Sequence, residues 1–155
     1  MSNKSKPTKE DVKEKALRVL EFRNHSEHEL REKLYRFGGE EEDINFAIEF
    51  CKEYGFLNDE HYAAALARDL SNLKKYGKHR IKTELLKRGI DSLYIESALS
   101  EIEDSDDVLT SLVSKKLKGS FEKKDIERTI RYFIYRGYNL TDIKHAIERL
   151  KVNEL

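Results

Sequence analysis

The chain has little of what secreted, membrane-spanning or β-rich proteins depend on. It contains one cysteine, Cys51, so an intramolecular disulfide is excluded. Because Cys51 falls on the apolar face of its expected helix, we predict a small buried side chain. The only proline is Pro7, and strand signals are almost absent. No apolar run approaches the roughly 20 residues that span a bilayer, and the N-terminus lacks the apolar core of a secretory signal. We therefore expect a cytoplasmic protein with no membrane partner.

Motifs for catalysis and for metal or cofactor binding are missing as well. There is no phosphate-binding glycine loop, no nucleophile elbow and no cysteine-based zinc pattern. His25 and His28 lie three residues apart, but no third ligand accompanies them, so we interpret them as surface histidines. The acidic segment Asp104–Asp107 lacks the glycine turn and the terminal glutamate of an EF-hand. We predict no enzymatic activity, no cofactor and no metal site.

The balance of charged and apolar residues argues against a single large core. Charged residues make up 39% of the chain and apolar residues 38%, whereas typical globular chains are about 25% charged. Several small cores, each formed by a three-helix unit, suit this composition better. The formal net charge is zero, so global charge points to neither nucleic acid nor membrane.

One apolar pattern occurs three times, each time around a glycine. The glycines are Gly38, Gly89 and Gly137, spaced by 51 and 48 residues. A large apolar residue precedes each glycine by four positions, and aliphatic residues follow it by six, nine and ten positions. Twelve positions before the glycines stand three residues that tolerate a helix N-cap: Ser26, Gly77 and Asp125. A helical unit repeated three times predicts a tandem array, and such arrays typically bind partners.

We predict an all-α fold of three tandem three-helix repeats that form an elongated, curved array. The expected divisions are a disordered N-terminus at 1–7 and three-helix units at 8–55, 56–103 and 104–155. The first helix of the second unit is expected to bury Tyr62, Leu66, Leu70 and Leu73. The predicted core comprises Leu30, Leu34, Ile44, Ile48, Leu66, Ile81, Leu85, Ile95, Leu99, Phe133, Ile143 and Ile147. No heptad seam is present, so we expect a monomer.

Basic residues gather in two stretches, 68–89 and 115–136. Between them, residues 91–107 carry seven acids and no lysine or arginine. Such runs are often only solvated faces, and the functional alternative is a surface for phosphates or for an acidic protein. Within 131–138 arginines alternate with aromatic residues. The alternatives there are a stacking platform for single-stranded bases and, favoured by the repeat phase of Phe133, the edge of a core.

Three segments carry ordered motifs. Residues 23–34 read RNHSEHELREKL, residues 55–63 read GFLNDEHYA, and residues 77–90 read GKHRIKTELLKRGI. Together they resemble the RecX regulatory proteins of bacteria, which modulate the RecA recombinase. The second motif has Asn58 at the first acidic place of the family pattern. The resemblance covers nearly all of the chain after residue 15, and Arg136-Gly137-Tyr138 stands for the Arg-Gly-Phe of the third unit.

The resemblance implies a protein that lies in the groove of a RecA–DNA filament and inhibits ATP hydrolysis and strand exchange. It implies a role in recombination, DNA repair and the SOS response, with DNA bound weakly or through the filament. From the residues alone, the alternatives are a helical protein that binds DNA phosphates and a generic helical-repeat scaffold. The residues we expect to face the filament or DNA are Lys74, Lys75, Lys78, Arg80, Lys82, Lys87, Arg88, Lys123, Lys124, Arg128, Arg131 and Arg136.

Overall fold

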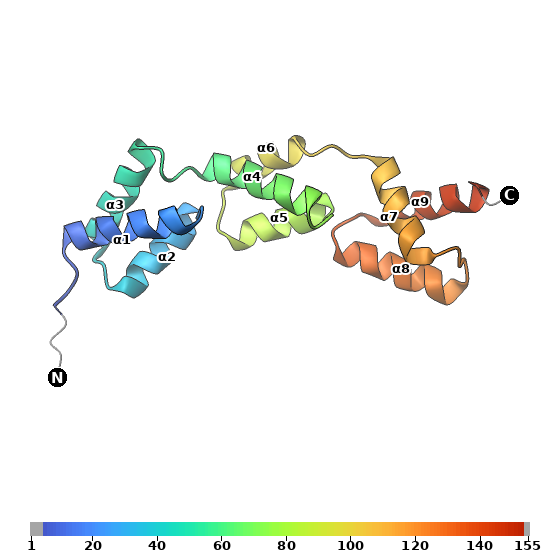
Figure 1. Cartoon of the computed structure of the whole chain (residues 1–155), viewed down its shortest axis with the longest axis horizontal. Coiled ribbons are helices and arrows are strands. Elements are labelled where there is room, and N and C mark those ends of the chain that lie inside the picture. The colour runs from blue at the N-terminus through green and yellow to red at the C-terminus, as the bar shows by residue number, and fades with distance from the viewer. Residues whose placement is uncertain (1–4, 154–155) are drawn as a thin grey trace. The chain divides into compact units, whose positions relative to one another are not determined.

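The computed structural model describes residues 5–153, and within them the chain forms nine α-helices and no strand (Figure 1). The all-α prediction is confirmed. Residues 1–4 of the predicted disordered N-terminus lie outside the described residues. The helices are α1 (Lys9–Phe22), α2 (Glu27–Phe37), α3 (Glu41–Glu53), α4 (Asp59–Asn72), α5 (Lys78–Lys87), α6 (Ser92–Ser100), α7 (Asp106–Leu117), α8 (Lys123–Tyr135) and α9 (Leu140–Asn153). None of these helices has both the length and the apolar character needed to cross a membrane.

The helices follow one another as three three-helix repeats, which confirms the predicted tandem organisation. Repeat 1 comprises α1–α3, repeat 2 α4–α6 and repeat 3 α7–α9. In repeat 1, α1 packs on α3 and α2 contacts both, and α7, α9 and α8 have the same relation in repeat 3. By internal contacts the chain divides into an N-terminal half, residues 5–66 and 85–98, and a C-terminal half, residues 67–84 and 99–153. Repeat 2 contributes to both halves, and each half is described by itself.

Local sequence signals fix the helices of repeat 1. Thr8 and Ser26 cap α1 and α2 through capping boxes, in which the N-cap hydroxyl accepts from a backbone N–H three residues on. Gly38 ends α2 with φ of 100°, in the left-handed region that glycine adopts without a Cβ clash. The core of the N-terminal half includes the buried residues Val12, Ala16, Leu30, Leu34, Ile44, Ala47, Ile48 and Cys51. Burial raises the pKa of the Cys51 thiol, which keeps it protonated and unreactive.

A second small core fills the C-terminal half. Leu109, Val113 and Leu117 of α7 pack with Phe133 of α8 and with residues of α9. The α9 residues are Ile143, Ala146 and Ile147. The α8 and α9 core positions recur at the same offsets from Gly137 as Leu34, Ile44, Ala47 and Ile48 do from Gly38, so the second and third helices of the two repeats bury equivalent faces.

Most of the residues expected in the core have no access to solvent. Of the twelve, Leu66 and Leu99 are partly buried and the others are buried. One further expectation was wrong: Leu73, assigned to the buried face of α4, is 76% exposed. The reason is that α4 ends at Asn72, so the helical spacing that predicted burial no longer applies at the next residue.

Candidate functional site

A polar joint connects repeat 1 with the glycine turn of repeat 2 inside the N-terminal half. The Ser26 hydroxyl donates a hydrogen bond to the backbone carbonyl of Arg88, and the Glu27 N–H donates to Asp59 Oδ1 at 2.8 Å. Gly89, with φ of +72°, lies so close that an added Cβ would stand 2.5 Å from Cβ of His28. Only glycine meets both the backbone conformation and the contact at this position.

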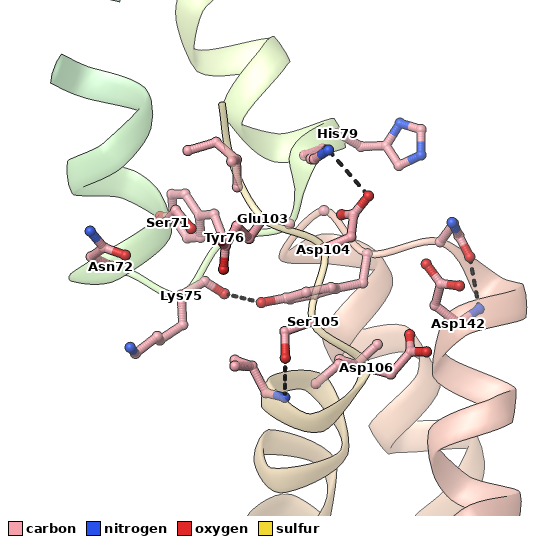
Figure 2. Close-up of a pocket in the computed structure, with 18 of the residues that line it drawn as sticks. Ser71, Asn72, Lys75, Tyr76, His79, Glu103, Asp104, Ser105, Asp106 and Asp142 are labelled. Carbon is pink, nitrogen blue, oxygen red and sulfur yellow. Dashed lines mark hydrogen bonds and ion pairs between the residues drawn. The ribbon is translucent and has the colours of Figure 1, made fainter. Parts of the chain in front are cut away.

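A matching joint lies inside the C-terminal half. The Gly77 N–H donates to the carbonyl of Arg136 at 2.8 Å, and the His79 N–H donates to that of Gly137 at 3.1 Å. An added Cβ on Gly77 would stand 2.4 Å from the Gly137 carbonyl oxygen, and one on Gly137 would stand 2.4 Å from Cβ of Arg80. The Tyr138 hydroxyl also donates to the Lys75 carbonyl at 2.8 Å, as Figure 2 shows.

The two joints occupy equivalent places in the repeat. Ser26 and Gly77 each precede the second helix of their own repeat, and each contacts the Arg-Gly turn that ends the second helix of the next repeat. The sequence predicted these residues only as caps and turns. A signal was present, however, because arginine precedes the glycine in repeats 2 and 3, whereas Phe37 precedes Gly38 in repeat 1.

Cations and tyrosine rings alternate beside the C-terminal joint. The Arg80 guanidinium lies 4.9 Å from the ring centroids of both Tyr76 and Tyr135. The Arg136 guanidinium lies between Tyr76 and Tyr132, at 5.0 and 5.5 Å. Such cation–π contacts contribute about 0.5–2 kcal/mol each, depending on desolvation. Arg80 also donates to Glu84 at 3.1 Å and to the Tyr135 carbonyl at 3.3 Å, so its side chain is committed to the joint.

The residues expected to face a filament do not lie on one body. Lys87 and Arg88 belong to the N-terminal half and the other ten to the C-terminal half. Several of these ten have protein partners: Lys78 pairs with Asp104, Lys123 with Glu127, Arg128 with Asp125, and Arg136 with the Lys74 carbonyl. Among these ten, five exposed side chains have no hydrogen-bond, ion-pair or cation–π partner within the described residues 5–153: Lys74, Lys75, Lys82, Lys124 and Arg131.

A cleft of about 630 Å³ opens beside the C-terminal joint (Figure 2). The acidic linker between α6 and α7 lines one side of it, and two of the linker carboxylates pair with cations of the cleft. Lys78 lies 3.1 Å from Asp104, and Arg68 lies 3.9 Å from Glu101. Two cations of the cleft are thus paired with its acidic linker, and Lys75, which also lines the cleft, extends its side chain away from it (Figure 2).

The interpretation of His25 as a surface histidine was wrong, because its side chain is buried beside the N-terminal joint and both ring nitrogens have protein partners. Its Nδ1 donates to the Arg23 carbonyl at 2.8 Å, and its Nε2 accepts from the Lys33 ammonium at 2.9 Å. Burial, with the positive charges of Arg23 and Lys33, lowers the pKa of the imidazole, although the Arg23 carbonyl and Glu29 oppose the shift. His28 is exposed and lies 3.3 Å from Glu32. Among residues 5–153, no group of three His, Cys, Asp or Glu side chains is arranged to hold a metal.

Carboxylates of the N-terminal joint are held by charge and by backbone. Burial is the largest single effect on Glu27, yet the ion pairs with Lys52 and Arg31 together lower the pKa of this carboxyl. Asp59, which accepts from the Glu27 N–H, has its pKa raised, chiefly by burial. These carboxylates have protein partners, so the N-terminal joint is a structural contact that offers no reactive group.

These features define a tandem three-helix repeat protein with an exposed cationic surface. Family models of the first and second three-helix domains of RecX match residues 13–51 and 58–99, respectively. The regulatory protein RecX of Clostridium perfringens (strain SM101 / Type A) is 36% identical over 149 residues, covering 92% of this chain and 69% of the relative. The regulatory protein RecX of Vibrio vulnificus (strain CMCP6) is 31% identical over 150 residues, covering 95% of this chain and 97% of the relative.

A solved structure agrees with these sequence matches. The crystal structure of RecX from Lactobacillus salivarius has the same fold, with a TM-score of 0.84 and 22% identity, covering 93% of this chain and 97% of that one. The chain belongs to the RecX family of regulatory proteins. The predicted resemblance is confirmed, and the family is one of regulatory proteins.

Proposed function

We propose that this protein binds a RecA–DNA filament in its groove and restrains ATP hydrolysis and strand exchange by the recombinase. It acts in recombination and DNA repair, as a cytoplasmic monomer, and contacts DNA chiefly through the filament. Membership in the RecX family supports the regulatory part of this proposal. The partner follows from the family's relation to the recombinase, as the sequence motifs imply.

The observation that carries the choice of surface is the set of unpaired cations on the C-terminal half. Lys74 and Lys75 lie on a segment whose carbonyls accept from Arg136 and Tyr138, so the backbone is anchored while both ammonium groups reach solvent. Lysine side chains on an anchored backbone keep their positive charges near one place on the surface, where DNA phosphates or acidic protein walls can reach them. Arg80 is not part of this surface, because its guanidinium is already bonded to Glu84 and to the Tyr135 carbonyl inside the joint.

The proposal is tested by ATP hydrolysis of the cognate recombinase on single-stranded DNA as this protein is titrated in. We expect inhibition well below one molecule per recombinase subunit. Unchanged hydrolysis at excess protein would refute the proposal. Tight binding to bare duplex with steep salt dependence would instead support the alternative of a DNA-phosphate binder.

Charge reversals test the surface itself. Lys74→Glu and Lys82→Glu remove cations that have no partner in the described chain, so they should weaken inhibition without lowering the free energy of unfolding. The matched control is Lys144→Glu, which makes the same charge change at an exposed lysine of α9. If all three variants inhibit the recombinase as strongly as the unaltered protein, the contact surface lies elsewhere. Arg80→Glu is less informative because it also breaks the joint.

A further inference from the structure

One face of α8 carries three cations and an exposed tyrosine in a single line. Lys124, Arg128, Arg131 and Tyr135 follow at spacings of four, three and four residues, which place them on one side of a helix. The opposite side carries Thr129 and Phe133, which are buried, with Ile126 and Ile130 packed against the same core. At about 1.5 Å of rise per residue, this line extends for about 16 Å. We call these four residues the α8 stripe.

Tyr135 at the end of the stripe is unusually open. It is 72% exposed, and the partner found for its ring is the Arg80 guanidinium, 4.9 Å from the ring centroid. Arg80 is fixed in turn by Glu84 and by the Tyr135 carbonyl. The ring is therefore held from one side by a bonded cation while much of its surface meets water.

The charges along the stripe favour an anionic strand. Lys124 and Arg131 have no partner in the described chain, and Arg128 reaches Asp125 only at 3.9 Å. The α8 carboxylates are engaged, because Asp125 accepts from the Ser120 hydroxyl at 2.5 Å and Glu127 lies near Lys123. No acid lies within the line of the stripe. Phosphates would meet cations along its length and reach an aromatic face at its end.

We propose that the α8 stripe binds single-stranded nucleic acid, with its cations on successive phosphates and the Tyr135 ring stacked on a base. Single strands fit this arrangement because their base faces are free, whereas the faces of duplex bases are covered by their neighbours. The tyrosine hydroxyl is not needed for stacking, and the Arg80 cation beneath the ring holds its orientation. This site goes beyond the proposed function because it requires no recombinase.

The test is fluorescence anisotropy of a labelled dT oligomer, with an abasic deoxyribose-phosphate oligomer of equal length as the control ligand. Tyr135→Ala and Tyr135→Leu should weaken dT binding by about 5- to 150-fold and leave abasic binding unchanged. Tyr135→Phe should bind dT like the unaltered protein. Leucine keeps apolar cover over Arg80, so agreement between the alanine and leucine variants separates lost stacking from lost packing. Tyr35→Ala, at an exposed tyrosine of α2, is the matched control and should change nothing.

The cations are tested in the same assay. Arg131→Gln should weaken binding to both oligomers and reduce the slope of log affinity against log salt by about 0.7. Anisotropy with a labelled oligo(rU) of the same length, compared with the dT oligomer, shows whether DNA or RNA binds more tightly. Equal binding of dT and abasic oligomers by the unaltered protein, or unchanged dT binding by Tyr135→Ala, would overturn the proposal. Those results leave inhibition of the recombinase intact, so failure of this site and failure of the proposed function are distinguishable.

Discussion

Substitution of Gly137 tests whether the C-terminal joint contributes to stability. Gly137 and Gly38 have nearly the same backbone conformation, with φ of +102° and +100°. An alanine at either position costs about 1–2 kcal/mol for the left-handed conformation alone. At Gly38 the nearest atom to an added Cβ is 3.5 Å away, an ordinary contact, whereas at Gly137 Cβ and N of Arg80 are both 2.4 Å away. That overlap adds about 1–3 kcal/mol to the cost of Gly137→Ala.

The other two joint glycines, Gly89 and Gly77, extend the comparison, and Gly55, which lies outside the joints, is the control for Gly89. Gly89 and Gly55 have φ of +72° and +76°, but an added Cβ meets His28 at 2.5 Å in the first case and no atom within 4 Å in the second. Gly77 is not in the left-handed region, so Gly77→Ala isolates the overlap with the Gly137 carbonyl. Each joint substitution should therefore lower the free energy of unfolding by about 1–3 kcal/mol beyond any conformational cost.

Urea unfolding followed by far-ultraviolet circular dichroism measures these differences. Where a joint opens without global unfolding, exchange of the Gly77 and His79 amide hydrogens should accelerate in Gly137→Ala, because both N–H groups donate across the joint. The reasoning is refuted when Gly137→Ala is no less stable than Gly38→Ala and exchange at those two amides is unchanged.

The remaining predictions concern a core residue and a buried histidine. Phe133→Ala should lower the free energy of unfolding by about 3–5 kcal/mol because the ring is buried. The control Phe22→Ala, at a ring that is 85% exposed, should lower it by less than about 0.5 kcal/mol. Similar losses in the two variants would contradict the assignment of Phe133 to the core. Because the folded-state pKa of His25 is lowered, the unfolded chain binds a proton first as pH falls below about 6.5. Stability should therefore decrease from pH 6.5 downward, and His25→Gln, but not His61→Gln, should flatten this dependence in urea melts taken from pH 7.5 to 5. A profile unaltered by His25→Gln would assign the pH dependence to other groups.

Local sequence signals were sufficient to predict the helices of repeat 1. Ser26 and Glu29 form the capping box that begins α2, and Gly38 ends it, because caps and left-handed turns depend on residues within one turn. The buried positions followed from helical spacing for the same reason. The prediction for Leu73 was wrong because α4 ends one residue before it, at Asn72, so its side chain does not follow the buried face of the helix.

The joints and the roles of individual arginines depend on contacts between distant residues. Ser26 and Arg88 are 62 residues apart, and no local pattern links a helix cap to a turn at that distance. Likewise, composition treated Arg80 as equivalent to Lys82, yet the Arg80 guanidinium lies between two tyrosine rings while Lys82 is exposed. Charge runs identify where cations are frequent, and only the fold shows which of them remain available to a partner.

The joint between repeats is directional, because the two surfaces that meet in it are different. One is a helix N-cap and the other an Arg-Gly turn, so the contact is of the head-to-tail kind that propagates into a fibre unless its ends are closed. In repeat 1, Pro7 lies at the Gly38 turn and Lys6 pairs with Glu40 at 2.8 Å, so the segment before α1 covers this turn. In repeat 3, α8 begins three residues before the position equivalent to the start of α2 and α5. The Gly38 turn is thus covered within repeat 1, and Asp125, the counterpart of Ser26 and Gly77, lies inside α8 and not before it.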